Sequence, residues 1–169
     1  MIVLSLLLMI ALVIIDLLIR KFILNIFVQF SERTKTDFDN FMVTNKVPRN
    51  IAHIIPLLIA LNFVPYVFFD FPGFENIIEK GLQVFSILLT IWIIRSFVHS
   101  LRDYFNTKDQ LKDKPINSYI QVVLIILWIL GLFSAFAVVT GIPFLRFITT
   151  LGAASAVILL IFKDTIMGF

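Results

Sequence analysis

Apolar residues along this chain gather into five long stretches that are separated by polar segments. The stretches cover roughly residues 2–19, 51–70, 82–100, 119–140 and 144–162. A helix rises about 1.5 Å per residue, so about 20 apolar residues cross the roughly 30 Å hydrocarbon core of a bilayer. The pattern therefore predicts an all-α, polytopic membrane protein with five transmembrane helices.

Two segments near the first and second spans need separate interpretation. The helical pattern continues past residue 19, and the polar segment 31–47 either extends that helix as far as Val47 or lies in the headgroup layer as an amphipathic element. The extension is slightly favoured. Pro56 and Pro65 predict kinks in the second span, because proline has no N–H to donate to the preceding turn. The sequence FDFPGFEN after that span predicts a tight Pro-Gly turn.

Lysine and arginine are unequally distributed between the connections. The 20–50 and 101–118 connections together hold ten, whereas the two remaining turns hold one each, Lys80 and Arg146. Short cytoplasmic loops of membrane proteins are enriched in these residues. The N-terminus is therefore predicted to lie outside, and the end of the last span to lie at the cytoplasmic face.

The 101–118 stretch is the only plausible linker within the chain. It separates a three-span, lipid-facing unit (1–100, with a polar helical connection at about 20–50) from a two-span hairpin (119–169). Between the last two spans, Gly141 is placed to end one helix and Pro143 to begin the next. Such a short turn predicts that these two spans are antiparallel neighbours.

The last span has an unusual middle. Gly152, Ala153, Ala154, Ser155 and Ala156 are five consecutive small residues. Small side chains let helix backbones approach closely in lipid, where no hydrophobic force draws helices together. Five in a row suit a helix with close neighbours on two or more sides, as in a ring around a pore. Tight packing in a bundle that conducts nothing explains them equally well.

Composition narrows the class further. The chain is 60% hydrophobic and 15% charged, contains no cysteine, and has 14 basic against 11 acidic residues, which does not indicate nucleic-acid binding. No spacing typical of a metal site, a catalytic triad or a phosphate-binding loop is present. We therefore expect no enzyme, no cofactor and no metal ion.

A few ionisable residues lie in or beside the spans. Asp16 and Arg20, four residues apart, predict a local ion pair, with an ion or proton relay as the alternative. Arg95 and His99 are expected to extend toward the headgroups, and His53 to lie at the interface.

The segments KPINSYIQVVLIILWILG and TTLGAASAVILLIFKDTIMG, within residues 114–169, resemble the small-conductance mechanosensitive channel family, most closely its five-span miniconductance branch. The resemblance implies a homoheptamer in the bacterial inner membrane whose last membrane helix lines a central pore. It also implies a sharp bend after that helix and a cytoplasmic vestibule. Because the sequence stops at Phe169, we expect a downstream cytoplasmic domain to be missing.

Residue by residue, the resemblance places the two pore-constricting positions on Ala156 and Leu160. It places Gly152, Ala153 and Ser155 in the packing between pore helices.

The cytoplasmic pore mouth departs from the family pattern. The family's bend glycine falls on Asp164, beside Lys163, although Gly168 could bend the chain instead. Val157 and Leu159 occupy positions where the family has small residues, which favours a high tension threshold or a small conductance.

The expected function is a channel that opens under membrane tension and passes small ions during hypo-osmotic shock. An apolar ring at Leu160 would dewet a narrow pore and block ions. Membrane lipids are the expected partners. Two alternatives stay open: a secondary transporter subunit, which would show broken helices and an internal repeat, and a non-conducting scaffold subunit.

Overall fold

The structure is a computed structural model that describes residues 2–33, 38–108 and 115–167. All elements within these ranges are helices. They are α1 (Ile2–Arg33), α2 (Phe38–Thr44), α3 (Val47–Ala52), α4 (Ile54–Val67), α5 (Pro72–Asn106), α6 (Ile116–Thr140) and α7 (Phe144–Met167).

Five helical segments are long and apolar enough to cross a membrane, which confirms the number of spans. They are Val3–Gln29, Val47–Val67, Pro72–Asn106, Ile116–Thr140 and Phe144–Lys163.

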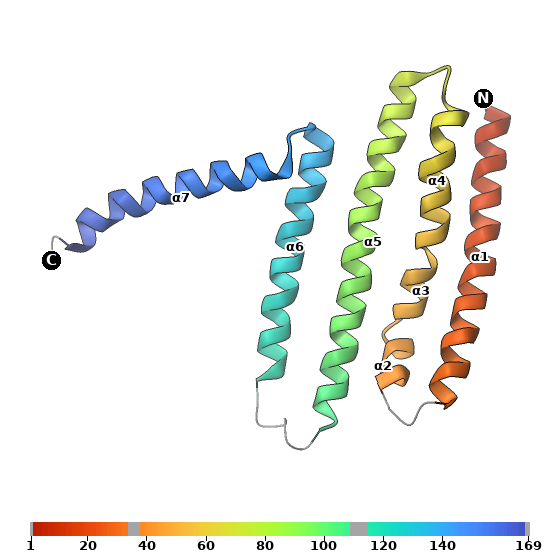
Figure 1. Ribbon diagram of the computed structural model, residues 1–169, viewed down its shortest axis with the longest axis horizontal. Coiled ribbons are helices and arrows are strands. Elements are labelled where there is room, and N and C mark those ends of the chain that lie inside the picture. Colours follow the sequence, from red (N-terminus) through yellow and green to blue (C-terminus); the bar gives the residue numbers. More distant parts are fainter. Residues whose placement is uncertain (1, 34–37, 109–114, 168–169) are drawn as a thin grey trace.

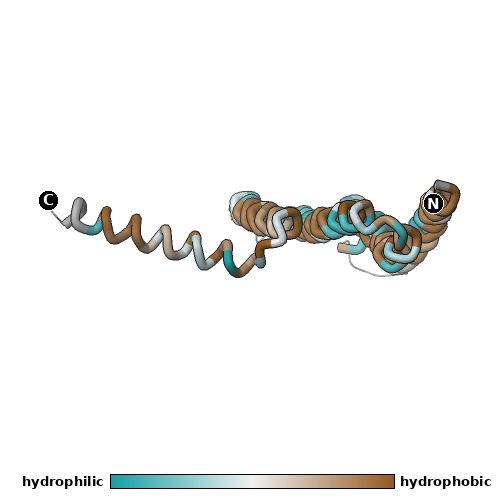
Figure 2. The backbone as a smooth tube through the Cα atoms, turned by 90° about the horizontal axis from the view of Figure 1, so that it is seen from above, coloured by the Kyte–Doolittle hydropathy of each residue, from teal (hydrophilic) through white to brown (hydrophobic). Residues whose placement is uncertain are grey.

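The first four spans stand side by side in a row (Figure 1). Helix α1 packs against the column formed by α2, α3 and α4, this column packs against α5, and α5 packs against α6. Seen from above, the row is one helix thick (Figure 2). Each helix therefore leaves large apolar surfaces without contacts within the chain.

The core is small and lies around the central column, because this column has neighbours on both sides. Its buried apolar residues are Val47, Ala52, Leu57, Ala60, Val64 and Phe68, joined by Leu89 and Ile91 of α5. Among the described residues, the span of α3 and α4 has the largest buried share of the five.

The structure contradicts the slightly favoured interpretation of segment 31–47. Helix α1 ends at Arg33, so the extension to Val47 is wrong. Helix α2 instead forms the lower end of the central column and packs against α5 (Figure 1). The ring of Phe38 contacts Phe97 and Tyr104 edge to face, with centroid distances of 6.0 and 5.5 Å. This aromatic cluster holds α2 on α5, and a position of α2 in the headgroup layer stays a prediction.

The second span is interrupted at His53, between α3 and α4. Pro56 lies in the first turn of α4 and has no N–H to donate to the carbonyl of Ala52, so one helical hydrogen bond is missing beside the interruption. The interruption agrees with the kink predicted at Pro56. Pro65 lies inside α4, which continues to Val67.

Two connections are shorter than expected. Helix α5 runs to Asn106, so residues 101–106 belong to a helix and not to the linker, while 109–114 lie outside the described residues. At the other end of α5, Pro72 and Gly73 begin the helix, and the turn itself is Phe68–Phe71, closed by the Phe71 N–H donating to the Phe68 carbonyl.

The helix ends that flank the two segments rich in basic residues lie at the same end of the row. Helices α1 and α5 end there and α2 and α6 begin there, whereas the α4–α5 and α6–α7 turns are at the other end (Figure 1). The charge bias therefore separates the two ends of the bundle. Assignment of the basic end to the cytoplasm stays a prediction.

Gly141 ends α6, as predicted. Its φ of 72° lies in the left-handed region, and its N–H donates to the Ala137 carbonyl at 2.9 Å. Pro143 directly precedes α7, and its carbonyl accepts the Arg146 N–H.

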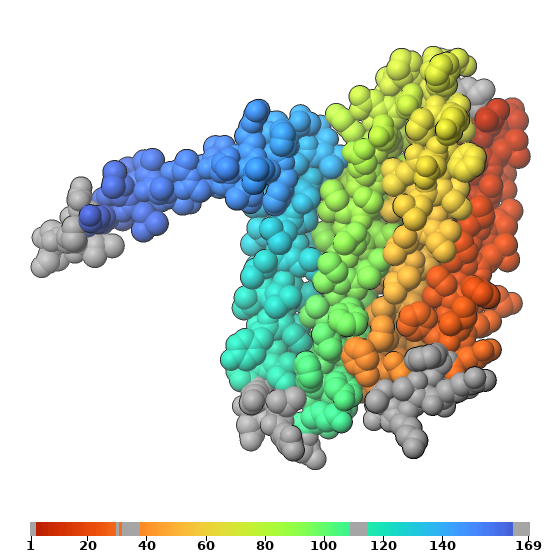
Figure 3. All heavy atoms as spheres, in the orientation of Figure 1, coloured from red at the N-terminus to blue at the C-terminus, as the bar shows by residue number. Residues whose placement is uncertain are grey.

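The expected antiparallel packing of the last two spans is wrong. Helix α7 leaves α6 at a steep angle and stands apart from the row (Figures 1 and 3). Contacts between them lie near the turn, where the rings of Phe136 and Phe147 are 5.2 Å apart. The turn does not reverse the chain fully, so most of α7 lies away from α6.

Candidate functional site

Helix α7 carries the positions that the resemblance assigns to a pore. It is the most amphipathic of the five spans. Bulky apolar residues recur on one face, at Phe144, Phe147, Ile148, Leu151, Ile158 and Phe162. At helical spacing, the opposite face holds Arg146, Thr149, Thr150, Ala153, Ala156, Val157 and Leu160.

Ala156 and Leu160 share this second, more polar face. Both are exposed, and no other helix of the chain contacts them. The hydroxyls of Thr149 and Thr150 on the same face donate to the Arg146 carbonyl at 3.0 and 2.7 Å. These threonines are therefore satisfied within the helix, and the face can meet either water or a neighbouring helix.

The predicted packing positions are also exposed. Gly152 has no atom within 4 Å of the place where a Cβ would stand. Ala153 lies beside Ala156 and Leu160, whereas Ser155 projects toward the bulky face. A partner for Gly152, Ala153 or Ser155 would have to come from outside this chain.

The last turns of α7 contain two of the three residues predicted for the cytoplasmic pore mouth, Lys163 and Asp164. Lys163 is exposed, and the helix continues through the backbone of Asp164 as far as Met167. The helix is therefore not interrupted at Lys163–Asp164, and the bend there stays a prediction. Gly168 lies outside the described residues.

A second polar site joins α1 to the interruption of the second span. Asp16 Oδ2 accepts from Arg20 Nη2 at 2.5 Å, which confirms the predicted local pair. Its other oxygen, Oδ1, contacts Nδ1 of His53 at 2.5 Å. These side chains are 18%, 28% and 27% exposed in that order, so the contact is largely shielded by the helices.

His53 is therefore not simply an interfacial residue. It lies where α3 ends and α4 begins, and its ring closes onto α1. The Arg20 Nε atom beside this contact is buried and has no hydrogen-bond partner. An apolar groove of α1 and α4 residues, including Leu12, Leu17 and Leu57, borders these polar groups.

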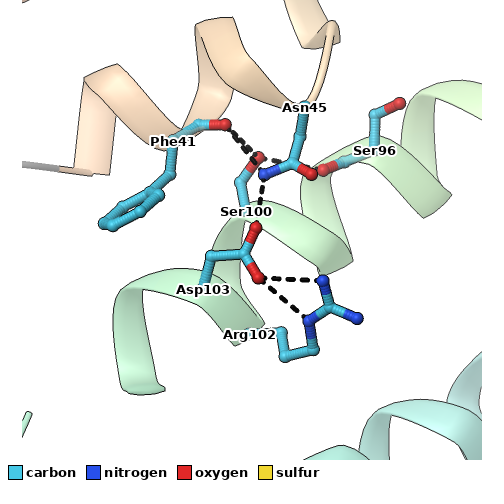
Figure 4. Close-up of polar contacts among 6 residues, drawn as sticks. All are labelled: Phe41, Asn45, Ser96, Ser100, Arg102 and Asp103. Carbon is cyan, nitrogen blue, oxygen red and sulfur yellow. Dashed lines mark hydrogen bonds and ion pairs between the residues drawn. The ribbon is translucent and has the colours of Figure 1, made fainter. Parts of the chain in front are cut away.

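A third polar cluster links α2 and its following turn to α5 (Figure 4). Asn45 Nδ2 donates to Asp103 Oδ2 at 2.9 Å and to the Phe41 carbonyl at 3.0 Å. The Ser100 hydroxyl donates to the same Phe41 carbonyl at 3.1 Å, and Arg102 pairs with Asp103. Ser100 is completely buried, so this cluster fixes α2 against α5.

The partners in these clusters are far apart in sequence, and periodicity did not reveal them. His53 and Asp16 are separated by 37 positions, and Asn45 and Asp103 by 58. One signal was present: Ser96 and Ser100 lie four apart in the second half of α5 and so share a face. A polar stripe inside a span predicts a polar partner on a neighbouring helix.

Within the part of the chain that the structure describes, no three His, Asp or Glu side chains gather as a metal site would require. No known protein family, curated protein or solved structure matches the chain.

Proposed function

We propose that this protein is the membrane part of a tension-gated ion channel, in which α7 helices of several copies line a central pore. One observation carries the proposal. A membrane-length helix leaves the row of the other spans, is mostly exposed, and carries small and polar residues on one face from Arg146 to Ala156. Helices of other subunits can pack closely against such a helix, because small side chains let backbones approach each other.

The resemblance of residues 114–169 to small-conductance mechanosensitive channels supports the same proposal. It suggests a ring of about seven subunits in the bacterial inner membrane, opened by hypo-osmotic shock. Ala156 and Leu160 are proposed to point into the pore, because they share the face that also holds Thr149 and Thr150.

The proposed gate is hydrophobic. A ring of Leu160 side chains at a narrow point excludes water and so blocks ions without a plug. Tension favours the state with the larger membrane area, and its work is the product of tension and area change. The row of α1 to α6, which exposes many large apolar side chains, is proposed to be the part on which lipid acts.

Substitution of Leu160 by serine tests the gate. Burial of a leucine side chain is worth about 1.5–3 kcal/mol, and the change is repeated in every subunit. Leu160→Ser should therefore hydrate the constriction and markedly lower the opening tension in patch recordings from liposomes. Ile158→Ser is the matched control, because Ile158 lies on the bulky face of the same helix.

An opening tension that stays unchanged in Leu160→Ser would remove this residue from the gate. If Leu160→Ser and Ile158→Ser changed the opening tension equally, the face that holds Ala156 and Leu160 would not be the one that lines the pore. Silence of the intact full-length protein up to patch rupture would favour the scaffold alternative.

A secondary transporter subunit stays as the second candidate, because the second span is interrupted beside ionisable groups. Interrupted helices hold substrate or ions in many transporters. His53 lies at the interruption and contacts Asp16 of α1. Substrate-dependent flux without current steps under tension, from an assembly much smaller than a ring of seven, would support this candidate.

A further inference from the structure

A cavity of about 410 Å³ lies between the α2–α3 turn and α5, near the basic end of the row. Its lining includes two cations, Lys46 and Arg95, together with His99, Asn50 and Ser96. The Asn50 side chain donates to Ser96 Oγ at 2.7 Å, which joins α3 to α5 across the cavity. No acidic residue lines it.

The two cations are available to a ligand. Neither Lys46 nor Arg95 has an acidic partner among the residues that the structure describes, and both are exposed. Asp103, the acidic residue further along α5, already accepts from Asn45 and Arg102. The cavity therefore carries a positive charge that the described residues do not neutralise.

The backbone at Lys46 indicates that this cation has a role. Its φ of 63° lies in the left-handed region, which residues with a Cβ rarely adopt. Glycine or asparagine would fit this turn better, and strained positions of this kind cluster at ligand sites. The turn is anchored on one side by Asn45 and on the other by Val47 and Pro48, which are buried.

One apolar side chain, Trp92 of α5, also lines the cavity. Trp92 lies three residues before Arg95 on α5, about one helical turn nearer the middle of the span, and is 39% exposed. Tryptophan prefers the boundary between headgroups and hydrocarbon. The cations of the cavity thus lie nearer the end of the span, and the aromatic ring lies nearer its middle. In a phospholipid, the phosphate and the acyl chain follow in the same order.

We propose that this cavity binds the headgroup phosphate of an anionic phospholipid. Arg95 and Lys46 contact the phosphate oxygens, Asn50 and Ser96 form the floor, and an acyl chain runs past Trp92. Arginine suits a phosphate because its guanidinium can donate two parallel hydrogen bonds. Basic pockets between transmembrane helices at the cytoplasmic side bind such headgroups. The proposal needs the chain to be embedded in a membrane and is independent of whether it conducts ions.

Tryptophan fluorescence offers a direct test, because the chain has only two tryptophans, Trp92 and Trp128. The Trp128→Phe protein reports from Trp92 alone. In vesicles of phosphatidylcholine, a small fraction of brominated phosphatidylglycerol should quench Trp92 several-fold more strongly than the same fraction of brominated phosphatidylcholine. Equal quenching by the two lipids would overturn the proposal.

The cationic residues are then changed in that protein. Lys46→Asn keeps a residue that tolerates the left-handed turn and removes the charge, while Arg95→Gln removes the second cation. Each should reduce the preference for the anionic lipid several-fold, and Arg95→Lys should retain part of it. Arg49→Gln, an exposed change on α3 that does not line the cavity, should retain it fully.

Two further experiments determine what causes the stronger quenching by the anionic lipid. If millimolar inorganic phosphate abolishes the preferential quenching, the site recognises free phosphate and the lipid proposal fails. The Trp92→Phe protein, which reports from Trp128 on α6, should show no preference between the lipids. The same preference at Trp128 would show general attraction of anionic lipid to the protein and would likewise contradict a site at this cavity.

Discussion

The closest approach between α5 and α6 depends on a single glycine. Gly131 is buried, and a Cβ built on it would stand 2.0 Å from Ile91 Cδ1 and 3.1 Å from Ile91 Cγ1. Ile91 is itself 3% exposed, so its side chain has little room to move. The absence of a side chain at Gly131 therefore sets the distance between these two spans.

Replacement of this glycine should loosen the α5–α6 contact. Gly131→Ala overpacks the site, and overpacking of this kind costs about 1–3 kcal/mol. We expect a lower thermal midpoint in detergent. Ile91→Val removes the methyl group that the new Cβ would meet, so the double variant should recover part of the loss. Additive losses in the double variant would show that the two residues do not compete for the same space.

At the same scale, the Asp16 site shows what local spacing can and cannot reveal. Its pairing with Arg20 followed from a separation of one helical turn. Its contact with His53 did not, because this depends on how α1 packs against the second span. Removal of one of the three side chains Asp16, Arg20 and His53 changes the pairing of the others, so the effects of substitutions at these positions are not independent.

At the scale of the helices, the second span contains an interruption for which its own sequence gives a reason. Helices α3 and α4 meet at His53, three residues before Pro56. A proline removes the hydrogen bond to the residue four before it and crowds that carbonyl. The break is thus encoded locally, and it places the His53 ring against α1.

Pro56→Ala should join α3 and α4 into one helix. The new N–H at position 56 can donate to the Ala52 carbonyl, and the His53 ring should then move away from Asp16. Slower amide exchange at residues 54–57 would report the joined helix.

Pro65→Ala is the matched control, because α4 already continues past Pro65. It should leave amide exchange at residues 54–57 unchanged. Exchange in Pro56→Ala that equals that of the unaltered protein would show that another feature causes the break.

Element boundaries were harder to predict than element type. All five spans were identified from apolar runs, yet α1 and α5 extend well past these runs. Residues 102–106 of α5 are polar or aromatic and still helical, because leaving the hydrocarbon does not end a helix. Hydropathy marks the membrane segment, whereas the helix end is set by capping and by neighbours such as Phe38.

For the whole molecule, the number of spans followed from the apolar runs, whereas their arrangement in a single row was not predicted. The assignment of the basic end to the cytoplasm stays a prediction. The direction of α7 could not be predicted from the sequence. A two-residue connection after Gly141 predicts neighbours, but the left-handed Gly141 and the rigid Pro143 set an angle that sequence spacing does not specify. The candidate pore positions could be named only from the resemblance, because nothing within one chain contacts them.

Assembly is the prediction that belongs to this scale. Gly152→Leu places a large side chain in the proposed contact between α7 helices and should reduce the fraction of intact rings seen by native mass spectrometry. Gly81→Leu is the control, because Gly81 is also helical and has no atom within 4 Å of its Cβ position. Intact rings with Gly152→Leu would show that the small residues are not an interface.

The turn at Gly141 and Pro143 is the place where α7 joins the rest of its own chain, so it also acts as a pivot. Helix α7 has 24 residues and is therefore about 36 Å long. A rotation of about ten degrees at the pivot moves the far end of such a rod by roughly 6 Å. A small tilt of α6 that is passed on through this turn therefore produces a large displacement at the far end of α7.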